Sequence, residues 1–252
     1  MKEKINITAQ TKQPDQDSNS GRVVSYVPFY TDEDITIIND DCLNVIDSLP
    51  PVDCIITDPP YGINFNRGYN KEYKQLVSGD DGFTVMFFLD EMLSLYQKKL
   101  KVGGAIYLFT RYDVMPYWWI KIKRYFTAKN IIIWDKGGGG IGDLEGNYAN
   151  DYEMIIYATN GRHLLNGKRE GAVWKVPKVK TEHHPTQKPE SIIRKIIEKS
   201  CPANGLILDP YMGSGTTLLA AKNLGRKAVG IELSREYCDV AKKRLTKKDL
   251  FS

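Results

Sequence analysis

Short runs of apolar residues alternate along this chain with longer segments in which apolar residues recur every three or four positions. The short runs predict buried strands, and the periodic segments predict amphipathic helices. Strands are expected at residues 35–39, 54–57, 102–109, 131–134 and 152–158, and helices at about 42–49, 83–100, 113–127 and 189–200. Residues 206–245 follow the order strand, glycine loop, helix, strand, helix. This alternation predicts an α/β fold built on one mostly parallel, doubly wound sheet.

The remaining segments divide the chain into a tail and one domain. Residues 1–30 are polar and aperiodic, which predicts a flexible N-terminal tail, and residues 31–252 form the expected single domain. Residues 62–80 are polar and contain several glycines, which predicts a loop. Four consecutive glycines at 137–140 begin a flexible region, and residues 161–183 show no clear secondary-structure pattern.

Composition excludes several classes of protein. The 252 residues are 42% hydrophobic and 26% charged, as in ordinary globular proteins. No apolar run approaches the roughly 18 residues that a membrane helix requires, and the first residues lack the apolar core of a signal peptide. We therefore expect a cytoplasmic protein without membrane contact. The four cysteines and three histidines lack metal-ligand spacing, so we expect no metal and buried reduced thiols.

Charge is distributed unevenly along the chain, although the net charge is only +4. Residues 31–60 hold eight acids and no Lys or Arg, whereas residues 161–180, here called the basic segment, hold six bases and one acid. Such a segment suits contact with phosphate groups, but a solvated loop has the same composition. Lys242, Lys243 and Arg244 are expected to form a solvated helix face.

The apolar run at 54–57 ends in the motif Asp58-Pro59-Pro60-Tyr61. Two prolines cannot extend a central strand, and the proline after Asp58 pushes that residue into an extended conformation. The resulting stiff corner lies where open α/β sheets bind ligands. The Asp58 carboxylate and the Pro59 carbonyl can hold the two hydrogens of a nucleobase amino group, while Tyr61 stacks on the base, which is worth about 1–3 kcal/mol. An ordinary surface turn is the alternative interpretation.

A second motif, Asp209-Pro210-Tyr211-Met212-Gly213-Ser214-Gly215-Thr216-Thr217, follows a strand and opens a helix. Gly213 and Gly215 allow a ligand to approach the backbone closely. The next strand, residues 228–231, ends in Glu232, where an acid can hold ribose hydroxyls as in dinucleotide sites. The loop lacks the third glycine of a dinucleotide fingerprint and the Gly-Lys-Ser/Thr of a phosphate-binding loop.

Together these motifs resemble the amino-DNA methyltransferases that use S-adenosylmethionine, in the subgroup whose Asp-Pro-Pro-Tyr motif precedes the cofactor motif. The resemblance covers about residues 35–245. It also includes Trp134-Asp135-Lys136, His184-Pro185-Thr186-Gln187-Lys188-Pro189, and residues 230–245 from the last strand to the last helix. The resemblance implies a Rossmann-like class I methyltransferase fold with a seven-stranded sheet, in which the strands before Asp58 and Asp209 lie side by side.

The resemblance also implies S-adenosylmethionine as the cofactor and double-stranded DNA as the partner, with the target base flipped out of the duplex. The implied catalytic residues are Asp58, Pro59, Pro60 and Tyr61. The implied cofactor site comprises Asp41 at the adenine ring, Glu232 at the ribose, Asp209, Gly213 and Gly215 at the methionine end, Thr186 and Lys188 closing over it, and Tyr211, Ser214 and Thr216 in the glycine loop. A larger side chain at Gly215 is therefore expected to weaken cofactor binding.

Several points stay open at this stage. The family usually has Phe where Tyr211 stands and Gly where Asp40 stands, and the region expected to read the target, residues 137–183, is short. Asp rather than Ser at position 58 favours adenine N6 as the methyl acceptor, with cytosine N4 as the alternative. A DNA-binding module that keeps the fold without turnover is a third hypothesis, and no residue excludes RNA as the substrate. A homodimer and a cognate restriction enzyme are further partners that the resemblance leaves open.

Overall fold

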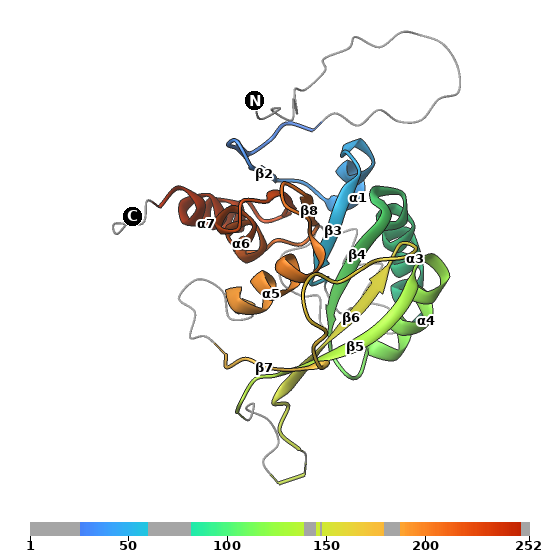
Figure 1. Ribbon diagram of the computed structural model, residues 1–252. Coiled ribbons are helices and arrows are strands. Elements are labelled where there is room, and N and C mark those ends of the chain that lie inside the picture. Colours follow the sequence, from blue (N-terminus) through green and yellow to red (C-terminus); the bar gives the residue numbers. More distant parts are fainter. Residues whose placement is uncertain (1–25, 60–81, 139–144, 147, 179–186, 248–252) are drawn as a thin grey trace, which may run out of the picture.

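The structure is a computed structural model that describes residues 26–59, 82–138, 145–146, 148–178 and 187–247 (Figure 1). Three expected site residues, Pro60, Tyr61 and Thr186, lie outside the described residues, as does the loop expected at 62–80. Most of the expected N-terminal tail lies outside them too. Its described end is attached to the sheet, because the backbone N–H of Phe29 donates to the carbonyl of Ile37 at 2.8 Å.

The centre of the molecule is a nine-stranded sheet in the order β1-β2-β9-β8-β3-β4-β6-β5-β7. In chain order the strands are β1 (Tyr30–Thr31), β2 (Ile35–Ile38), β3 (Val52–Thr57), β4 (Leu100–Thr110), β5 (Thr127–Asp135), β6 (Tyr152–Thr159), β7 (Val173–Lys175), β8 (Leu206–Asp209) and β9 (Lys227–Ile231). The seven strands between the two edges match the expected sheet, and β1 and β7 correct its size from seven to nine. These edge strands are two and three residues long, too short to show a strand pattern in the sequence.

The directions of the strands confirm a mostly parallel sheet. The neighbours β2, β9, β8, β3 and β4 are all parallel to one another. Strand β6 runs antiparallel to both β4 and β5, and β1 runs antiparallel to β2. The carboxyl ends of the five neighbouring parallel strands therefore meet along one edge of the sheet.

Helices cover both faces of the sheet (Figure 1). One group comprises α5 (Glu190–Ser200), α6 (Thr216–Asn223) and α7 (Arg235–Thr246), and the other comprises α1 (Cys42–Val45), the 3-10 turn η1 (Ile46–Ser48), α3 (Gly82–Lys99) and α4 (Met115–Tyr125). Ile56 of β3 packs in the core cluster with the first group, whereas its neighbour Ile55 packs in the cluster with the second. Because successive strand side chains point to opposite faces, the uninterrupted apolar run of β3 reflects burial on both sides.

The expected helices at 83–100, 113–127 and 189–200 are confirmed as α3, α4 and α5, each within a few residues of the expected ends. The helix expected at 42–49 is instead the short α1 followed by η1. Within the described part of the chain, no helix combines the length and the apolar content needed to cross a membrane.

Candidate functional site

Four acids follow four neighbouring strands at one edge of the sheet. Asp41 comes after β2, Glu232 after β9, Asp209 at the end of β8 and Asp58 after β3, and these strands are adjacent in the order β2-β9-β8-β3. Because β3 is hydrogen-bonded to β8, the two motifs lie side by side despite their separation in the sequence. The expected adjacency of the strands before Asp58 and Asp209 is confirmed. Ligands of open α/β sheets bind outside this edge.

Asp209 is the most deeply buried of these acids, with 5% of its surface exposed. Burial raises the pKa of Asp209 to about 7, and the nearby carboxylates of Asp58 and Glu232 add to this increase. The Thr217 hydroxyl and the backbone N–H of Tyr211 donate to Asp209 and partly oppose the increase. Asp209 therefore holds the start of the glycine loop and carries a carboxyl group that titrates near neutral pH.

The two glycines of the loop serve different purposes. Both adopt left-handed backbone angles, with φ of 51° at Gly213 and 79° at Gly215. Among the described residues, a Cβ at Gly213 would meet nothing within 4 Å, whereas a Cβ at Gly215 would lie 2.7 Å from the Cβ of Ala241 in α7. The backbone at Gly213 is therefore open to a ligand. Gly215 is required for the packing of α7, which the sequence did not reveal.

Glu232 connects the glycine loop to β9. Its Oε2 accepts a hydrogen bond from the Gly213 N–H at 3.1 Å, and its Oε1 accepts one from the Ser234 N–H at 2.8 Å. Burial raises the pKa of Glu232, and these backbone donors partly oppose the increase. Glu232, the acid expected at the ribose, thus also holds the glycine loop in position.

Asp41 is held by its own neighbourhood. Its Oδ1 caps α1 by accepting from the Leu43 N–H at 3.0 Å, while its backbone N–H donates to Asp40 Oδ1 at 2.7 Å. Asp40 Oδ1 also accepts from the Asn44 amide at 3.1 Å. Asp40, which departs from the usual glycine of the family, therefore supports the position of Asp41.

Arg244 of α7 lies against the glycine loop and corrects the expectation of a solvated face. Its Nη1 donates to the Ser214 carbonyl at 2.6 Å, to Ser214 Oγ at 3.1 Å and to Thr216 Oγ1 at 3.2 Å. Burial lowers the pKa of this guanidinium. Lys242 and Lys243 are exposed, as expected. The loop is also linked to the segment before α5, because Ser214 Oγ donates to Gln187 Oε1 at 3.3 Å.

Tyr211 points towards the core rather than along the sheet edge. Its ring packs against the core cluster that contains α3, and its hydroxyl donates to the sulfur of Met92 at 3.5 Å. The family's usual phenylalanine would fit the same apolar surroundings but would lack the hydroxyl contact with Met92.

Asp58 is the first member of a chain of four alternating charges, which continues through Lys188 and Glu153 to Lys136. Lys188 Nζ lies 2.9 Å from Asp58 Oδ2 and 2.9 Å from Glu153 Oε2, and Lys136 Nζ lies 3.7 Å from Glu153 Oε1. The pKa of Lys188 would be lowered by burial, but the two carboxylates raise it above its ordinary value. The pKa of Lys136 is lowered by burial, against the opposing effect of Glu153. Beside Asp58, Pro59 is buried.

Three residues of this site were not predicted to belong to it: Glu153, Lys136 and Arg244, the last of which was expected on a solvated helix face. Lys136 belongs to the Trp134-Asp135-Lys136 stretch, so a signal for it was present. Glu153 is one polar residue at the start of an apolar strand, and nothing in its surroundings in the sequence marks it.

Metal chemistry finds no support in the described segments, where no group of three or more His, Cys, Asp and Glu side chains is arranged to hold an ion. The four cysteines are free and buried, which confirms the expected reduced thiols. Burial raises the pKa of the Cys42 thiol to about 12, so it is inert at neutral pH.

Comparisons with known proteins identify the relatives of this chain. The family described as DNA methylase matches residues 52–243. The DNA adenine methyltransferase YhdJ of Escherichia coli (strain K12) is 29% identical over 248 residues, which cover 83% of this chain and 82% of that protein. The type II methyltransferase M2.LlaDCHI of Lactococcus lactis subsp. cremoris is 31% identical over 256 residues, which cover 90% of this chain and 95% of that protein.

Solved structures agree with the fold. The crystal structure of the M1.HpyAVI–SAM complex superposes with a TM-score of 0.65 at 29% identity and covers 84% of this chain and 100% of its own. The cytosine-N4-specific PvuII DNA methyltransferase superposes with a TM-score of 0.73 and covers 88% of this chain and 90% of its own. At 15% identity, that second likeness establishes the fold alone.

Proposed function

Since this chain belongs to the DNA methylase family whose members methylate adenine N6 or cytosine N4, we propose that it transfers a methyl group from S-adenosylmethionine to adenine N6 at specific sites in double-stranded DNA. The observation that carries the proposal is the adjacency of β3 and β8. This pairing brings the Asp58 corner and the glycine loop to the same edge of the sheet. A methyl donor at one motif and an amino group at the other would therefore lie close together.

The residues at the glycine loop fit the cofactor. The open space above Gly213 admits a ligand to the backbone, and the Glu232 carboxylate beside it can accept hydrogen bonds from ribose hydroxyls. Asp41 lies at the next strand end, where we place the adenine ring. When bound, S-adenosylmethionine supplies an electrophilic methyl group on a positively charged sulfur. The chain's own task is to hold it, exclude water and present the acceptor.

The Asp58 corner is suited to the acceptor. The lone pair of an exocyclic amine is delocalised into its ring, so two fixed acceptors that hold its hydrogens turn the lone pair towards the methyl donor. The Asp58 carboxylate and the Pro59 carbonyl supply these acceptors, and the carboxylate stabilises the positive charge that develops on the amine. The base must be flipped out of the duplex, which costs a few kcal/mol, and we assign stacking on Tyr61 to offset that cost.

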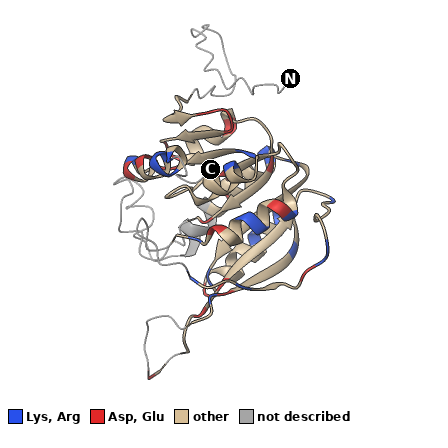
Figure 2. Cartoon of the chain, turned by 60° about the vertical axis from the view of Figure 1, so that its left-hand side comes forward, with Lys and Arg blue, Asp and Glu red and all other residues tan. Residues whose placement is uncertain are grey.

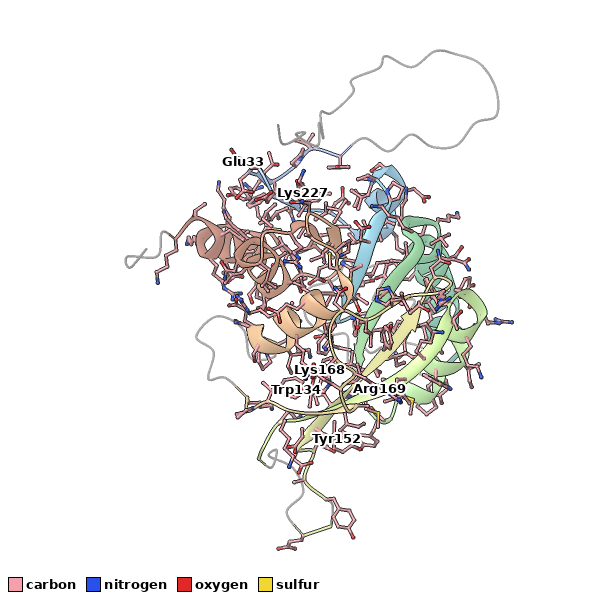
Figure 3. The ribbon with its side chains drawn as sticks, in the orientation of Figure 1. Glu33, Trp134, Tyr152, Lys168, Arg169 and Lys227 are labelled. Atoms are coloured by element: carbon pink, nitrogen blue, oxygen red, sulfur yellow. The ribbon has the colours of Figure 1, made fainter. Side chains whose placement is uncertain are left out.

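The basic segment is our candidate for contact with DNA phosphates. Glu170 ties it to α5 through Lys195 at 2.6 Å and Lys199 at 2.7 Å, and Lys199 also donates to the Lys168 carbonyl at 2.7 Å. Five bases are exposed on the segment, Arg162, Lys168, Arg169, Lys175 and Lys178, and so are three large apolar residues, Leu164, Leu165 and Val173. Figure 3 labels Lys168 and Arg169 on the connection between β6 and β7, which forms the first part of this segment. The anchored backbone favours phosphate contact over a plain solvated loop.

Adenine is preferred over cytosine for two reasons. By resemblance, Asp at position 58 is typical of enzymes that act on adenine N6. YhdJ, which aligns with 83% of this chain, is named as an adenine methyltransferase. The names of other relatives as type II methyltransferases support a cognate restriction enzyme as a further partner.

The test is the modified nucleoside itself. The protein would be incubated with unmethylated DNA and labelled S-adenosylmethionine, and the digested DNA analysed by mass spectrometry. N6-methyladenine is the expected product, and N4-methylcytosine would overturn the choice of base. Cofactor binding without any methylated nucleoside, on DNA or RNA, would instead identify a binding module without turnover.

A variant of Asp58 and a matched control variant test the role of the carboxylate. Asp58→Ala should retain cofactor binding and lower the rate by about 10²–10³-fold, since a preorganised acceptor is lost. Glu33→Ala is the control, because Glu33 is exposed in the turn before β2, away from the strand ends of the site (Figure 3). An Asp58→Ala variant as active as Glu33→Ala would refute the role of Asp58.

A further inference from the structure

Lys188 occupies an unusual position for a residue expected to contact the cofactor. Only 11% of its side chain is exposed, and its ammonium lies between the carboxylates of Asp58 and Glu153 at 2.9 Å from each. The ring of Phe109 lies beneath it, with the Nζ 5.2 Å from the ring centre. A lysine side chain is flexible, but the two ion pairs and the contact with the Phe109 ring fix the position of this ammonium group.

The contacts of Lys188 come from three different parts of the sheet. Asp58 follows β3, Phe109 lies near the end of β4, and Glu153 lies at the start of β6. Strand β6 is antiparallel to β4, so its first residues lie at the edge where the parallel strands end. Lys188 thus joins the catalytic corner to a strand that carries neither of the two motifs.

We propose that Lys188 is a positioning residue for Asp58 and that Glu153 anchors it, so that the Asp58 carboxylate keeps the orientation that receives the target amino group. This inference rests on the proposed function, because it assigns a role within the same site. It replaces the expectation that Lys188 acts on the cofactor.

The charges support this role. Asp58, Lys188, Glu153 and Lys136 alternate in sign, so the group as a whole is close to neutral. An isolated lysine beside a positively charged sulfonium would be unfavourable, whereas a lysine paired with two carboxylates presents little net charge. Glu153 also holds the Lys188 ammonium from the side opposite Asp58, so the ammonium keeps its position when the Asp58 side chain moves.

The effect of losing Lys188 should therefore appear in the rate and not in cofactor affinity. A misplacement of about 1 Å in a reacting group can cost about 10²-fold in rate. Lys188→Met removes the charge and keeps much of the length of the side chain, whereas Lys188→Arg keeps a cation that can bridge both carboxylates. Glu153→Gln removes the anchor and leaves the Asp58–Lys188 pair in place.

The experiment measures single-turnover methyl transfer by the full chain on saturating DNA, together with the dissociation constant for S-adenosylmethionine and the melting temperature. The control is Lys101→Met, which breaks another lysine–aspartate pair, with Asp53 at 2.9 Å, far from the site at the start of β4. We expect a loss of about 10²-fold for Lys188→Met, about tenfold for Glu153→Gln, and partial recovery in Lys188→Arg. Cofactor affinity should stay within about threefold of wild type in all of them.

Two results would overturn the inference: a Lys188→Met rate like that of Lys101→Met, or a loss confined to cofactor affinity. If Lys188→Met fails to fold, Glu153→Gln decides in the same way, with a wild-type rate overturning the inference. The two proposals fail separately. A wild-type product of N4-methylcytosine refutes adenine as the base, yet a slow Lys188→Met still supports the role of Lys188. An active Lys188→Met making N6-methyladenine refutes the positioning role and leaves the function standing.

Discussion

Asp209 shows how one buried acid links the stability of the protein to its site. The pKa of Asp209 is about 7 in the folded protein because of burial and the nearby acids, and its ordinary value is 3.8. Between these values the folded state binds more protons than the unfolded state. The stabilisation from this proton is therefore complete below about pH 4 and is lost as the pH rises through about 7.

Asp209→Asn tests this linkage, because the amide cannot titrate. Relative to the variant, the wild type should lose free energy of unfolding as the pH increases from about 4 to 8, by an amount on the order of a few kcal/mol. Urea denaturation of both proteins without ligand, at a series of pH values, measures the difference. Parallel pH profiles for the two proteins would show that Asp209 is ionised throughout this range.

The sequence identified the acids that follow strands, because a polar residue after an apolar run is visible without a structure. Asp58, Asp209 and Glu232 were recognised in this way, whereas the role of Asp41 was implied by the family resemblance. Glu153 was missed, since its role depends on β6 running antiparallel and on a lysine from a distant segment. No local pattern encodes such a pair.

At the scale of elements, the glycine loop gives a prediction that separates packing from binding. Gly215→Ala places a Cβ 2.7 Å from Ala241 in α7, at a φ of 79°, so it should destabilise the fold by roughly 2 kcal/mol. Gly213→Ala meets open space and carries only the strain of its φ of 51°, roughly 1 kcal/mol. Its methyl group should instead obstruct the ligand.

Melting temperature and cofactor affinity, measured on both glycine variants, distinguish these effects. We expect the larger fall in melting temperature for Gly215→Ala. For Gly213→Ala we expect the larger loss of S-adenosylmethionine affinity relative to its fall in melting temperature. The same ranking in both measurements would mean that the two glycines share one role, as the sequence alone had suggested.

Helix α7 adds a second prediction at this scale. Arg244 donates to Ser214 and Thr216, so Arg244→Ala should loosen the glycine loop and weaken S-adenosylmethionine binding by about tenfold, in line with the loss of a charged hydrogen bond. Lys243→Ala is the matched control, because Lys243 is the exposed base next to it. Isothermal titration calorimetry of both variants measures the affinity for S-adenosylmethionine. Equal affinities would mean that Arg244 has no role in cofactor binding, as first expected for a residue on a solvated helix face.

The elements themselves were largely predictable. Within the described residues, long periodic segments and apolar runs gave every helix of three or more turns and all seven inner strands of the sheet. The edge strands β1 and β7 were not predictable, since two or three residues cannot display a period and their pairing depends on the neighbouring strand. The packing of α7 on the glycine loop depends on tertiary contacts in the same way.

At the scale of the whole molecule, the topology explains how the order of motifs along the chain becomes one site. Strand β3 is inserted between β8 and β4, so the earlier motif lies beside the later one. Charge is less informative at this scale, because Figure 2 shows basic and acidic residues distributed over many elements. The way in which a segment is held is therefore better evidence for DNA contact than the net charge.

The basic segment is held against α5 in this way. Its backbone is tied to α5 by Glu170, by Asn166, whose N–H donates to the Lys199 carbonyl at 2.8 Å, and by Lys195, whose ammonium lies 4.7 Å from the centre of the Trp174 ring. A plain solvated loop has no need of these anchors, whereas a phosphate-binding segment gains from being ordered before it binds. Reversing the charge of Lys168 and Arg169 together should therefore weaken DNA binding about equally for all sequences.

The salt dependence of binding tests this assignment. If both side chains contact phosphates, the Lys168→Glu/Arg169→Glu variant should lower the slope of log affinity against log salt by about 2, while S-adenosylmethionine affinity stays unchanged. A control with Lys123→Glu and Lys129→Glu reverses two exposed bases on α4 and the early part of β5. Equal slopes in the two variants would mean that only general charge matters. A loss confined to one DNA sequence would instead place the segment at base edges, because phosphate contacts carry no sequence information.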